Sequence, residues 1–271
     1  MINQDKIEMY CVTNKRLRFL ENFEYNLSWV GKEKSPDNYI KCDFKDNIFF
    51  KEKYYSELTF HYWYWKNKLD ISRNNWVGFC QKRRFWIKRD SDIENINKEN
   101  IQNHLLVNSY EEWDDYQIIV CNSINVNNVK KLKLIKRGYK SILKQPEIFF
   151  NKEKQSLKLH FDMHHGYGNL DKAINFMKEI DRDDFRNYIN NKTSYNPHIM
   201  FITKPTTLDK WFNSLFEWLF KCEEEFGFDN LKGYDTGRLY AYLAERYLSF
   251  WVDKYLKKFT MPWLVYEENI S

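Results

Sequence analysis

The stretch Ser56–Trp86, SELTFHYWYWKNKLDISRNNWVGFCQKRRFW, carries the pattern that decides the fold. Its first half predicts a helix, because Leu58, Tyr62 and Trp65 recur at spacings of four and three and therefore share one face. Ser56 stands where an N-cap is expected, and the polar NKLD segment marks the end of the helix.

A strand followed by positive charge makes up the second half of the stretch. Trp76–Cys80 is an apolar run too short for a helix, and the Asn pair before it favours a buried strand. Lys82, Arg83 and Arg84 follow its carboxyl end. In open α/β sheets the ligand crevice lies at the carboxyl ends of strands, and two adjacent guanidinium groups suit a diphosphate. The pattern therefore predicts either an anion site or a solvated basic turn after a core strand.

The composition indicates a globular protein of balanced charge. Of 271 residues, 43% are hydrophobic and 18% are aromatic, which is ample for a sizeable core. The 43 Lys and Arg residues are offset by 38 Asp and Glu residues, so the net charge is only +5. This balance argues against a dedicated nucleic-acid binder, while it is compatible with anionic substrates or loose attraction to an acidic membrane surface.

The cysteines and the apolar runs bear on the compartment. Five cysteines without a CxxC pair predict reduced thiols, not a disulfide framework or a zinc ribbon. The first residues, MINQDKIEMY, lack the layout of a signal peptide, and no run approaches the ~20 apolar residues of a membrane span. We therefore expect a cytoplasmic protein that is soluble or peripheral at the inner face of the cytoplasmic membrane.

Further apolar runs predict more strands of the same sheet. Ile7–Val12 ends in Thr13, Asn14 and Lys15, and small polar residues after a first strand are typical of a nucleotide site. The other two predicted strands are Gln117–Cys121 and Ile199–Lys204.

The remaining segments predict mostly helices. Asn169–Ile180 and Leu208–Phe226 are amphipathic, and Gly227 closes the second of these helices. A helix is also expected near residues 98–110. Residues 16–53 are expected to be loops with short pieces of structure, and residues 124–156 carry no motif.

A histidine cluster, His160-Phe-Asp-Met-His-His, is a candidate for chemistry. In a helix His160 would lie against His164, and Asp162 against His165; in a strand His160, Asp162 and His164 would share a face. Either arrangement could hold a metal or supply a general base, and the alternative is a set of polar side chains that line a loop or are satisfied in the core.

The last predicted helix begins near Gly237. Arg238, Tyr242, Glu245 and Ser249 lie at spacings of four, three and four and share a face. A face that carries both an Arg and a Glu predicts either a site that needs them or an Arg238–Glu245 pair at the surface.

Three blocks, in order along the chain, resemble one protein family. They are ELT-x-x-YW-x-WKN at 57–67, VG-x-C-x-x-RR at 77–84 and R-x-x-x-YL-x-ER-x-L at 238–248. They resemble small bacterial glycosyltransferases of capsule, exopolysaccharide and O-antigen clusters, a family catalogued as a domain of unknown function. Typical members read CHYRRYF where this chain has CQKRRFW, so both arginines match while Gln81 and Lys82 replace a His and a Tyr.

The resemblance implies a GT-A-like α/β fold in a single glycosyltransferase domain over residues 1–271. A sheet-rich donor-binding half would occupy about 1–125, and a helical acceptor-side half about 126–271. The implied activity is transfer of a sugar from a nucleotide-diphosphate donor to a growing capsular, lipooligosaccharide or O-antigen glycan. Expected partners are the nucleotide sugar, a glycan or lipid-linked oligosaccharide acceptor, and peripherally the inner membrane or other glycan-assembly enzymes, with no nucleic acid. The alternatives are a non-catalytic carbohydrate-binding protein and a nucleic-acid-binding protein.

Individual residues receive roles on the same basis. The expected donor-binding residues are Thr13, Asn14, Lys15, Glu57, Lys82, Arg83, Arg84, Arg238 and Arg246. The expected catalytic residues are Asp162, Glu245 and His165. The candidate bases are Asp162, Glu245 and Glu57, and Asp162 is preferred because a paired Glu245 would be weakly basic. Glu57 opens its helix, where a carboxylate is stabilised in its ionised form whatever its function. No acidic pair follows the strand, so Arg83 and Arg84 are expected to replace a divalent metal. The fallback metal ligands are Asp162, His164 and His165.

Overall fold

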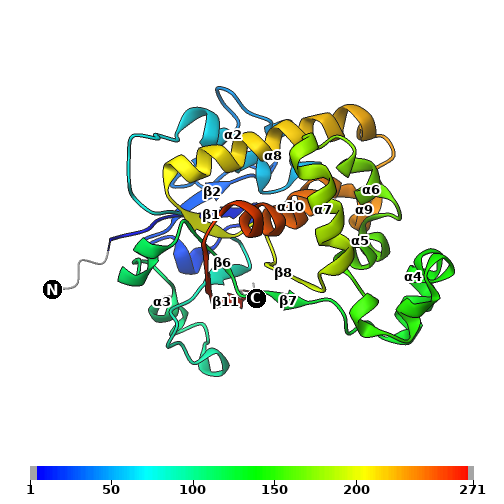
Figure 1. Cartoon of the computed structure of the whole chain (residues 1–271). Coiled ribbons are helices and arrows are strands. Elements are labelled where there is room, and N and C mark those ends of the chain that lie inside the picture. Colours follow the sequence, from blue (N-terminus) through cyan, green and yellow to red (C-terminus); the bar gives the residue numbers. More distant parts are fainter. Residues whose placement is uncertain (1–4, 268–271) are drawn as a thin grey trace.

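The computed structural model describes residues 5–267, apart from the side chain of residue 234. A central sheet runs through the molecule, and helices cover it (Figure 1). In the described part of the chain the sheet contains nine strands: β1 (Glu8–Thr13), β2 (Asn26–Trp29), β3 (Ile40–Lys41), β4 (Val77–Gln81), β5 (Arg84–Trp86), β6 (Ile118–Cys121), β9 (Phe201–Thr203), β10 (Lys258–Met261) and β11 (Trp263–Val265). A separate two-stranded sheet pairs β7 (Ile124–Asn125) with β8 (Ser194–Tyr195).

The central sheet is mostly parallel. Its strand order is β10-β6-β9-β4-β1-β2-β3, and β5 extends from β4 to pair with β11. Strand β1 lies between β4 and β2 and is parallel to both, with Cys11 opposite Cys80 and Leu27. Strand β9 is antiparallel to its neighbours β4 and β6. The carboxyl ends of β1, β2 and β4 therefore meet at one edge, which is where a ligand crevice is expected.

Helices pack on the sheet. The α-helices are α1 (Glu52–Tyr55), α2 (Leu58–Asn67), α3 (Ile101–His104), α4 (Lys131–Lys144), α5 (Leu157–His165), α6 (Asn169–Ile174), α7 (Glu179–Asn191), α8 (Pro205–Phe226), α9 (Gly233–Gly237) and α10 (Leu239–Tyr255). Short 3₁₀ helices are η1 (Arg18–Leu20), η2 (Phe49–Lys51), η3 (Ile93–Asn95), η4 (Glu111–Asp115), η5 (Pro146–Phe149) and η6 (Lys152–Lys154). Helices α2, α8 and α10 lie on one side of the sheet, and α3 lies on the other (Figure 1).

Alternate side chains of β1 supply the two faces of the core. Tyr10 and Val12 pack with the aromatic side chains of α2 and with α8 and α10. Met9 and Cys11 point to the opposite face, where the core is closed by residues of β5 and α3 and by Trp113. All five cysteines are buried and free, as expected for reduced thiols.

All four predicted strands and the long helix are confirmed. The expected runs correspond to β1, β4, β6 and β9, and α8 ends at Gly227, whose φ of 57° lies in the left-handed region. Helix α2 ends at Asn67 as expected. Ser56, however, is no N-cap: it joins α1 to α2 with φ 52°, and Glu57 occupies the N-cap position of α2.

Other boundaries differ from the expectations. The helix near 98–110 is reduced to the single turn of α3, and Asn169–Ile180 divides into α6 and the start of α7. Strands β2 and β3 occupy part of the segment expected to be loops. Helix α4 lies within residues 124–156, the segment without a motif. Most of its apolar side chains are exposed instead of facing the core.

Candidate functional site

A tight turn at the carboxyl end of β4 separates two hollows of the surface. Gln81 pairs with Arg84 across the β4–β5 hairpin, and Lys82 and Arg83 form the turn. Lys82 lines a large open cleft, whereas Arg83 and Arg84 line a smaller pocket. The predicted cations therefore lie on the wall between two neighbouring cavities and not in bulk solvent.

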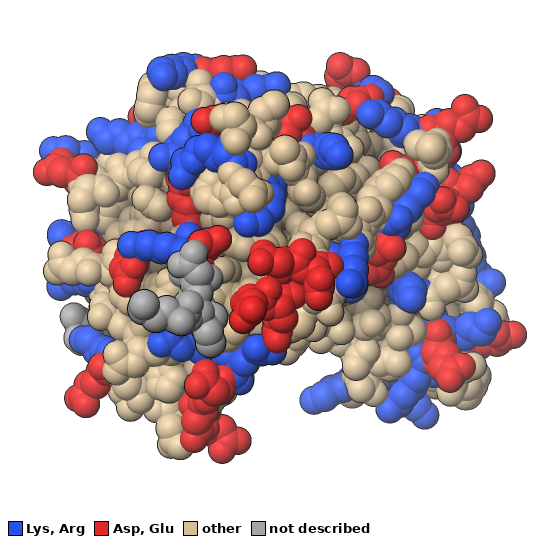
Figure 2. All heavy atoms as spheres, turned by 60° about the vertical axis from the view of Figure 1, so that its left-hand side comes forward, with Lys and Arg blue, Asp and Glu red and all other residues tan. Residues whose placement is uncertain are grey.

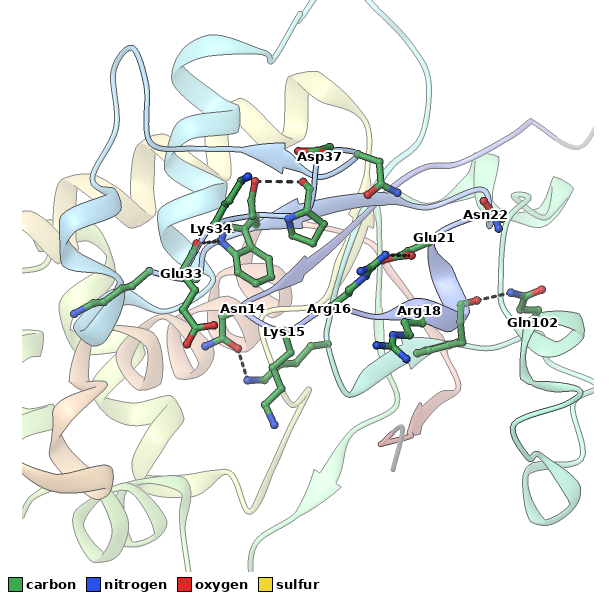
Figure 3. Close-up of a pocket in the computed structure, with 18 of the residues that line it drawn as sticks. Asn14, Lys15, Arg16, Arg18, Glu21, Asn22, Glu33, Lys34, Asp37 and Gln102 are labelled. Atoms are coloured by element: carbon green, nitrogen blue, oxygen red, sulfur yellow. Dashed lines mark hydrogen bonds and ion pairs between the residues drawn. The ribbon is translucent and has the colours of Figure 1, made fainter. Parts of the chain in front are cut away.

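The large cleft has a volume of about 1570 Å³ and lies at the carboxyl ends of β1 and β2 (Figure 3). Asn14 and Lys15, which follow β1, line it as predicted, and the Lys82 ammonium donates a hydrogen bond to the Asn14 side chain. Thr13 is buried beneath them and its hydroxyl donates to the Lys15 carbonyl at 2.6 Å. Trp29 contributes its ring to the cleft.

Positive charges converge near Lys82. Its pKa is lowered by burial and then by the neighbouring cations Lys15, Arg238 and Arg83. Lys15 follows β1, Arg238 immediately precedes α10 and Arg83 lies in the β4–β5 turn, so residues far apart in sequence are brought together. A bound dianion would offset their mutual repulsion, since nearby opposite charge favours the protonated amine.

The smaller pocket has a volume of about 400 Å³. It is bordered by the α1–α2 junction, the β4–β5 hairpin, α4, α5, the segment before β9, and α9–α10. Its lining residues are Ser56, Glu57, Gln81, Arg83, Arg84, Lys133, His160, His164, His165, Tyr195, His198, Ile199, Asp235, Arg238, Ala241, Tyr242, Glu245 and Arg246.

Glu245 and Arg246 form a buried ion pair in this pocket. Arg246 Nη1 donates to Glu245 Oε2 at 2.7 Å, and the guanidinium also lies 3.9 Å above the Tyr195 ring. Burial opposes ionisation of Glu245, but Arg246 and His198 outweigh it, so the pKa of the carboxyl is lowered. The pair stays charged, and the alternative of a surface Arg238–Glu245 pair is wrong.

Helix α5 carries the histidine cluster, so the helical alternative is confirmed. The ring centroids of His160 and His164 are 4.8 Å apart, and His160 Nδ1 lies 3.0 Å from Arg246 Nη2. His165 stacks on Tyr242 with centroids 3.6 Å apart. Its Nδ1 lies 3.1 Å from the Asp235 carbonyl oxygen, which can only accept, so Nδ1 carries the proton and Nε2 is an acceptor.

These histidines are neutral at pH 7. Burial lowers the pKa of His160 to about 2, with Arg246 as the next cause. Burial likewise lowers the pKa of His164 and His165 to about 4. The pocket therefore combines neutral acceptor nitrogens with fixed guanidinium charges.

Two residues of the pocket have unusual backbone conformations. His198 has φ 64° and Ser56 has φ 52°, and among described residues other than glycine only Lys45 shares a positive φ. The backbone N–H of His198 donates to Glu245 Oε1 at 2.6 Å, which holds that conformation. Strained backbone of this kind clusters at functional sites because it must be held by its surroundings.

Three buried nitrogens that border the pocket have no hydrogen-bond partner. They are Arg84 Nε, Arg246 Nε and His198 Nε2. An unsatisfied buried polar atom is costly, so these atoms mark places where a ligand or water is expected. Nearby, the side chain of Gln81 links Arg84 to Glu57. Arg84 Nη1 donates to Gln81 Oε1 at 3.3 Å, and Gln81 Nε2 donates to Glu57 Oε1 at 2.5 Å.

Asp162 lies apart from the other predicted catalytic residues. It is buried and does not line the pocket. Lys158 donates to one oxygen at 2.6 Å and the backbone N–H of Gly168 to the other at 3.0 Å. Burial raises its pKa, with Lys158 opposing the rise, but a raised pKa does not make a base without access to substrate. These contacts join α5 to the start of α6, and Asp162, which does not line the pocket, is not placed to act as the expected base.

The fallback metal ligands do not converge either. Within residues 5–267, no group of three or more His, Cys, Asp and Glu side chains is arranged to hold a metal ion. Asp162 is engaged by Lys158 and Gly168, and His164 Nδ1 lies 3.2 Å from Arg137 Nη1. The set Asp162, His164 and His165 therefore does not fit a metal.

The structure brings most of the other predicted residues together. Glu57, Arg83, Arg84, His165, Arg238, Glu245 and Arg246 line the pocket, and Asn14, Lys15 and Lys82 line the cleft. Sequence reasoning missed His198, Tyr195 and Lys133. Only the positive φ of His198 distinguishes it, and nothing in the sequence signals that conformation.

Fold and site together define an α/β protein with a charged crevice at the carboxyl edge of a mostly parallel sheet. The chain belongs to the family described as "Domain of unknown function (DUF4422)", which it matches over residues 8–257. No curated protein matches the chain.

A solved structure shares the fold. The apo structure of the bifunctional glycosyltransferase WbbM matches with a TM-score of 0.71 and 19% identity. The match covers 97% of this chain and 46% of that one, so this chain spans less than half of that protein. In the described residues, every helix is too short or too polar to cross a membrane.

Proposed function

We propose that the protein is a glycosyltransferase that moves a sugar from a nucleotide-diphosphate donor to a glycan or lipid-linked acceptor of bacterial surface polysaccharide assembly. The observation that carries this proposal is the convergence of Lys15, Lys82, Arg83 and Arg238 between a large cleft and a small pocket. The fold shared with a glycosyltransferase is consistent with it.

The two cavities suit the two halves of such a donor. The large cleft at the end of β1 has room for the nucleoside. The diphosphate would lie across the β4–β5 turn against Lys82 and Arg83. The sugar would then enter the small pocket, where Arg84 and Arg246 present unpaired N–H groups and His198 an unpaired ring nitrogen.

The reaction joins the acceptor hydroxyl oxygen to the anomeric carbon and breaks the bond from that carbon to the diphosphate. The nucleoside diphosphate leaves with the electron pair, so negative charge grows next to Lys82 and Arg83. Cations fixed there before reaction stabilise that charge without reorganising.

The proton of the acceptor needs a base, and we assign Glu57 to this role. Both oxygens of Glu245 already accept hydrogen bonds, from Arg246 and from the His198 backbone, and its pKa is lowered. Asp235 pairs with Arg137 at 3.2 Å. Glu57 lines the pocket on the helix beside the β4–β5 turn and is oriented by Gln81.

A screen for donor binding tests the proposal. Nucleoside diphosphates and nucleotide sugars should raise the melting temperature, because a ligand that binds only the folded state stabilises it. Transfer is then assayed with each binder. Glu57→Gln should bind the donor normally and lose transfer by a factor of at least about 100, the usual contribution of general base catalysis. Lack of a shift with every nucleotide, together with binding of a glycan, would favour the carbohydrate-binding alternative.

The aromatic residues weigh against that alternative. All ten tryptophans are buried or half-buried, and most rings belong to the core clusters. A nucleic-acid groove is also weakly indicated, because Lys, Arg, Asp and Glu are interspersed over the face shown in Figure 2. Binding of nucleic acid needs a positive groove lined with stacking platforms.

The proposal assigns the charge stabilisation to the chain's own cations. Lys82 and Arg83, in the turn of the hairpin, would take the role that a divalent metal has in many glycosyltransferases, whereas Arg84, which the sequence paired with Arg83 in this role, would face the sugar. Activity that persists in EDTA is the expected result. Complete loss in EDTA with rescue by manganese would show that this assignment of charge is wrong.

A further inference from the structure

Helix α4 exposes an unusual apolar stripe. Leu132, Ile135, Tyr139 and Leu143 recur at spacings of three, four and four, so they lie on one face of the helix. Leu132 is 83% exposed and Leu143 is 78% exposed. This face is not the one that packs on the protein, because Leu134 and Gly138 are the buried positions of the helix.

The inner face of α4 is fixed to the body of the protein. Leu134 packs with Leu159 and Met163 of α5. On the same side Lys133 lines the small pocket, and Arg137 pairs with Asp235. The helix is therefore a structured element with one anchored side, and its outer side is apolar. In Figure 1 it lies at the periphery, outside α5.

Positive charge accompanies the apolar stripe. The helix KLKLIKRGYKSILK contains six Lys or Arg residues and no Asp or Glu. Lys136, Lys140 and Lys144 follow one another at spacings of four along one flank of the stripe. Phe150, shortly after the helix, is 82% exposed and adds to the exposed apolar surface.

We propose that the outer face of α4 docks on an anionic lipid bilayer. An apolar stripe flanked by lysines is the pattern of helices that lie in the bilayer interface, with apolar side chains among the acyl chains and cations at the headgroups. The absence of acidic residues from α4 favours an anionic surface over a neutral one. A soluble protein partner would need acidic groups opposite the lysines, and a second copy of α4 would bring six further positive charges against these six.

The position of α4 links this docking to the choice of acceptor. This inference about the acceptor rests on the proposed function, whereas the docking itself does not. Lys133 and Arg137 connect the docked helix to the small pocket. The pocket would thus lie within reach of the headgroup layer, so the acceptor class is a lipid-linked glycan, presented from the membrane, instead of a free oligosaccharide.

Vesicle flotation without any sugar donor tests the docking. The full chain should float with vesicles of phosphatidylcholine and phosphatidylglycerol, and should bind vesicles of phosphatidylcholine alone at least about tenfold less, since each surface lysine adds attraction to anionic lipid. Leu132→Gln/Leu143→Gln should lower the partition coefficient at least about tenfold, because two leucine side chains no longer leave water. Lys136→Gln/Lys140→Gln should lower it on anionic vesicles only.

A matched control separates the stripe from general stickiness. Ile71→Gln/Ile180→Gln removes two other apolar side chains, 59% and 70% exposed, and should float as the original chain does. Circular dichroism verifies that each variant is folded. Failure to float, equal loss in the control, or a dimer in light scattering that the leucine variant abolishes would each overturn membrane docking.

Insertion can be followed directly. Because the five native cysteines are buried, Leu143→Cys introduces an accessible thiol for an environment-sensitive fluorophore. Its emission should shift to the blue on anionic vesicles, whereas a label at Ile71→Cys should not change. A shift at both positions, or at neither, contradicts the proposal. Nucleotide binding in solution is measured separately, so failure of the docking leaves the donor site untouched.

Discussion

The Glu245 carboxylate accepts a hydrogen bond at 2.6 Å from the backbone N–H of His198, which stands in the left-handed region at φ 64°. The other oxygen of Glu245 accepts from Arg246 at 2.7 Å. One side chain of α10 thus holds both a strained backbone and a buried guanidinium. Through these two contacts the carboxylate fixes the positions of His198 and Arg246, which both line the pocket.

Replacing that carboxylate should destabilise the whole fold. Arg246 is 1% exposed, and in Glu245→Gln it would keep its charge while losing the charge that offsets it. Breaking a buried pair in this way costs about 3–5 kcal/mol. Urea denaturation measures the loss, and Glu217→Gln, which removes the partner of the exposed Lys178 and Lys221, should cost less than about 1 kcal/mol. Equal losses would show that Glu245 has no special structural role.

Binding of a nucleoside diphosphate should weaken as the pH rises into the alkaline range. The pKa of Lys82 is lowered by burial and by nearby cations, so the free protein loses this proton earlier than an ordinary lysine does. A bound diphosphate favours the protonated form, and affinity falls once the free amine is neutral. Isothermal titration calorimetry at several pH values measures this dependence.

Three variants sharpen that experiment. Lys82→Arg should bind with little dependence on pH, because arginine stays charged. Lys210→Gln, at an exposed position of α8, should behave as the original chain does. If Lys82→Gln binds the diphosphate as tightly as the original chain, the anion lies elsewhere.

Asp162→Asn should retain transfer and lose stability. The carboxylate accepts from Lys158 and from the Gly168 backbone away from the pocket, so its removal weakens the α5–α6 junction without removing a base. We expect a loss of about 1–3 kcal/mol in urea denaturation, the usual range for a charged buried hydrogen bond. A hundredfold fall in turnover at unchanged stability would restore Asp162 as the base.

The protein should lose stability as the pH falls below about 6.5. Burial among Phe79, Phe201 and Phe212 lowers the pKa of His61 from its ordinary 6.5 to about 3. Between these values the unfolded chain binds a proton that the folded chain does not, so stability falls as the pH falls through the window. The buried histidines of the pocket act in the same direction.

His61→Leu isolates one part of this effect. Removing an imidazole with an unpartnered buried Nδ1 should raise stability at pH 5 by about 2 kcal/mol relative to the original chain, and by less at pH 7. Thermal melts at the two pH values make the comparison. An identical gain at both would assign the effect to packing instead of protonation.

Local patterns predicted the frame of the molecule well. The apolar run before Lys82 identifies β4, and the apolar run that ends in polar residues after Val12 identifies β1. Both can be predicted because the end of a strand is encoded by a few consecutive residues. Parallel strands then bring the ends together, which is why Asn14 and Lys82 meet. Residue spacing alone does not decide between a helix and a strand for the histidine cluster, because its six residues fit both periods.

The rest of the site depends on tertiary contacts. The conformation of His198 is held by Glu245 from α10, and the isolation of Asp162 follows from Lys158 and Gly168. The contacts of Glu245 with His198 and of Asp162 with Gly168 are not visible in residue spacing, whereas Lys158 and Asp162 are an i, i+4 pair that spacing shows only once the segment is known to be a helix. Helix α4 is not among the predicted helices, because residues 124–156 are rich in Lys, Asn and Ile and carry no motif. Leu132, Ile135, Tyr139 and Leu143 nevertheless have helical spacing, and the sequence does not show that this face points to solvent.

The five buried thiols can report the order in which parts of the core become accessible during unfolding. Cys11, Cys80 and Cys121 belong to one side of the core, and Cys42 and Cys222 to the other. An alkylating reagent can reach each thiol only after the helices or loops that cover that side of the sheet have unfolded or separated from it. The order in which the five become modified would therefore tell which side of the sheet is uncovered first.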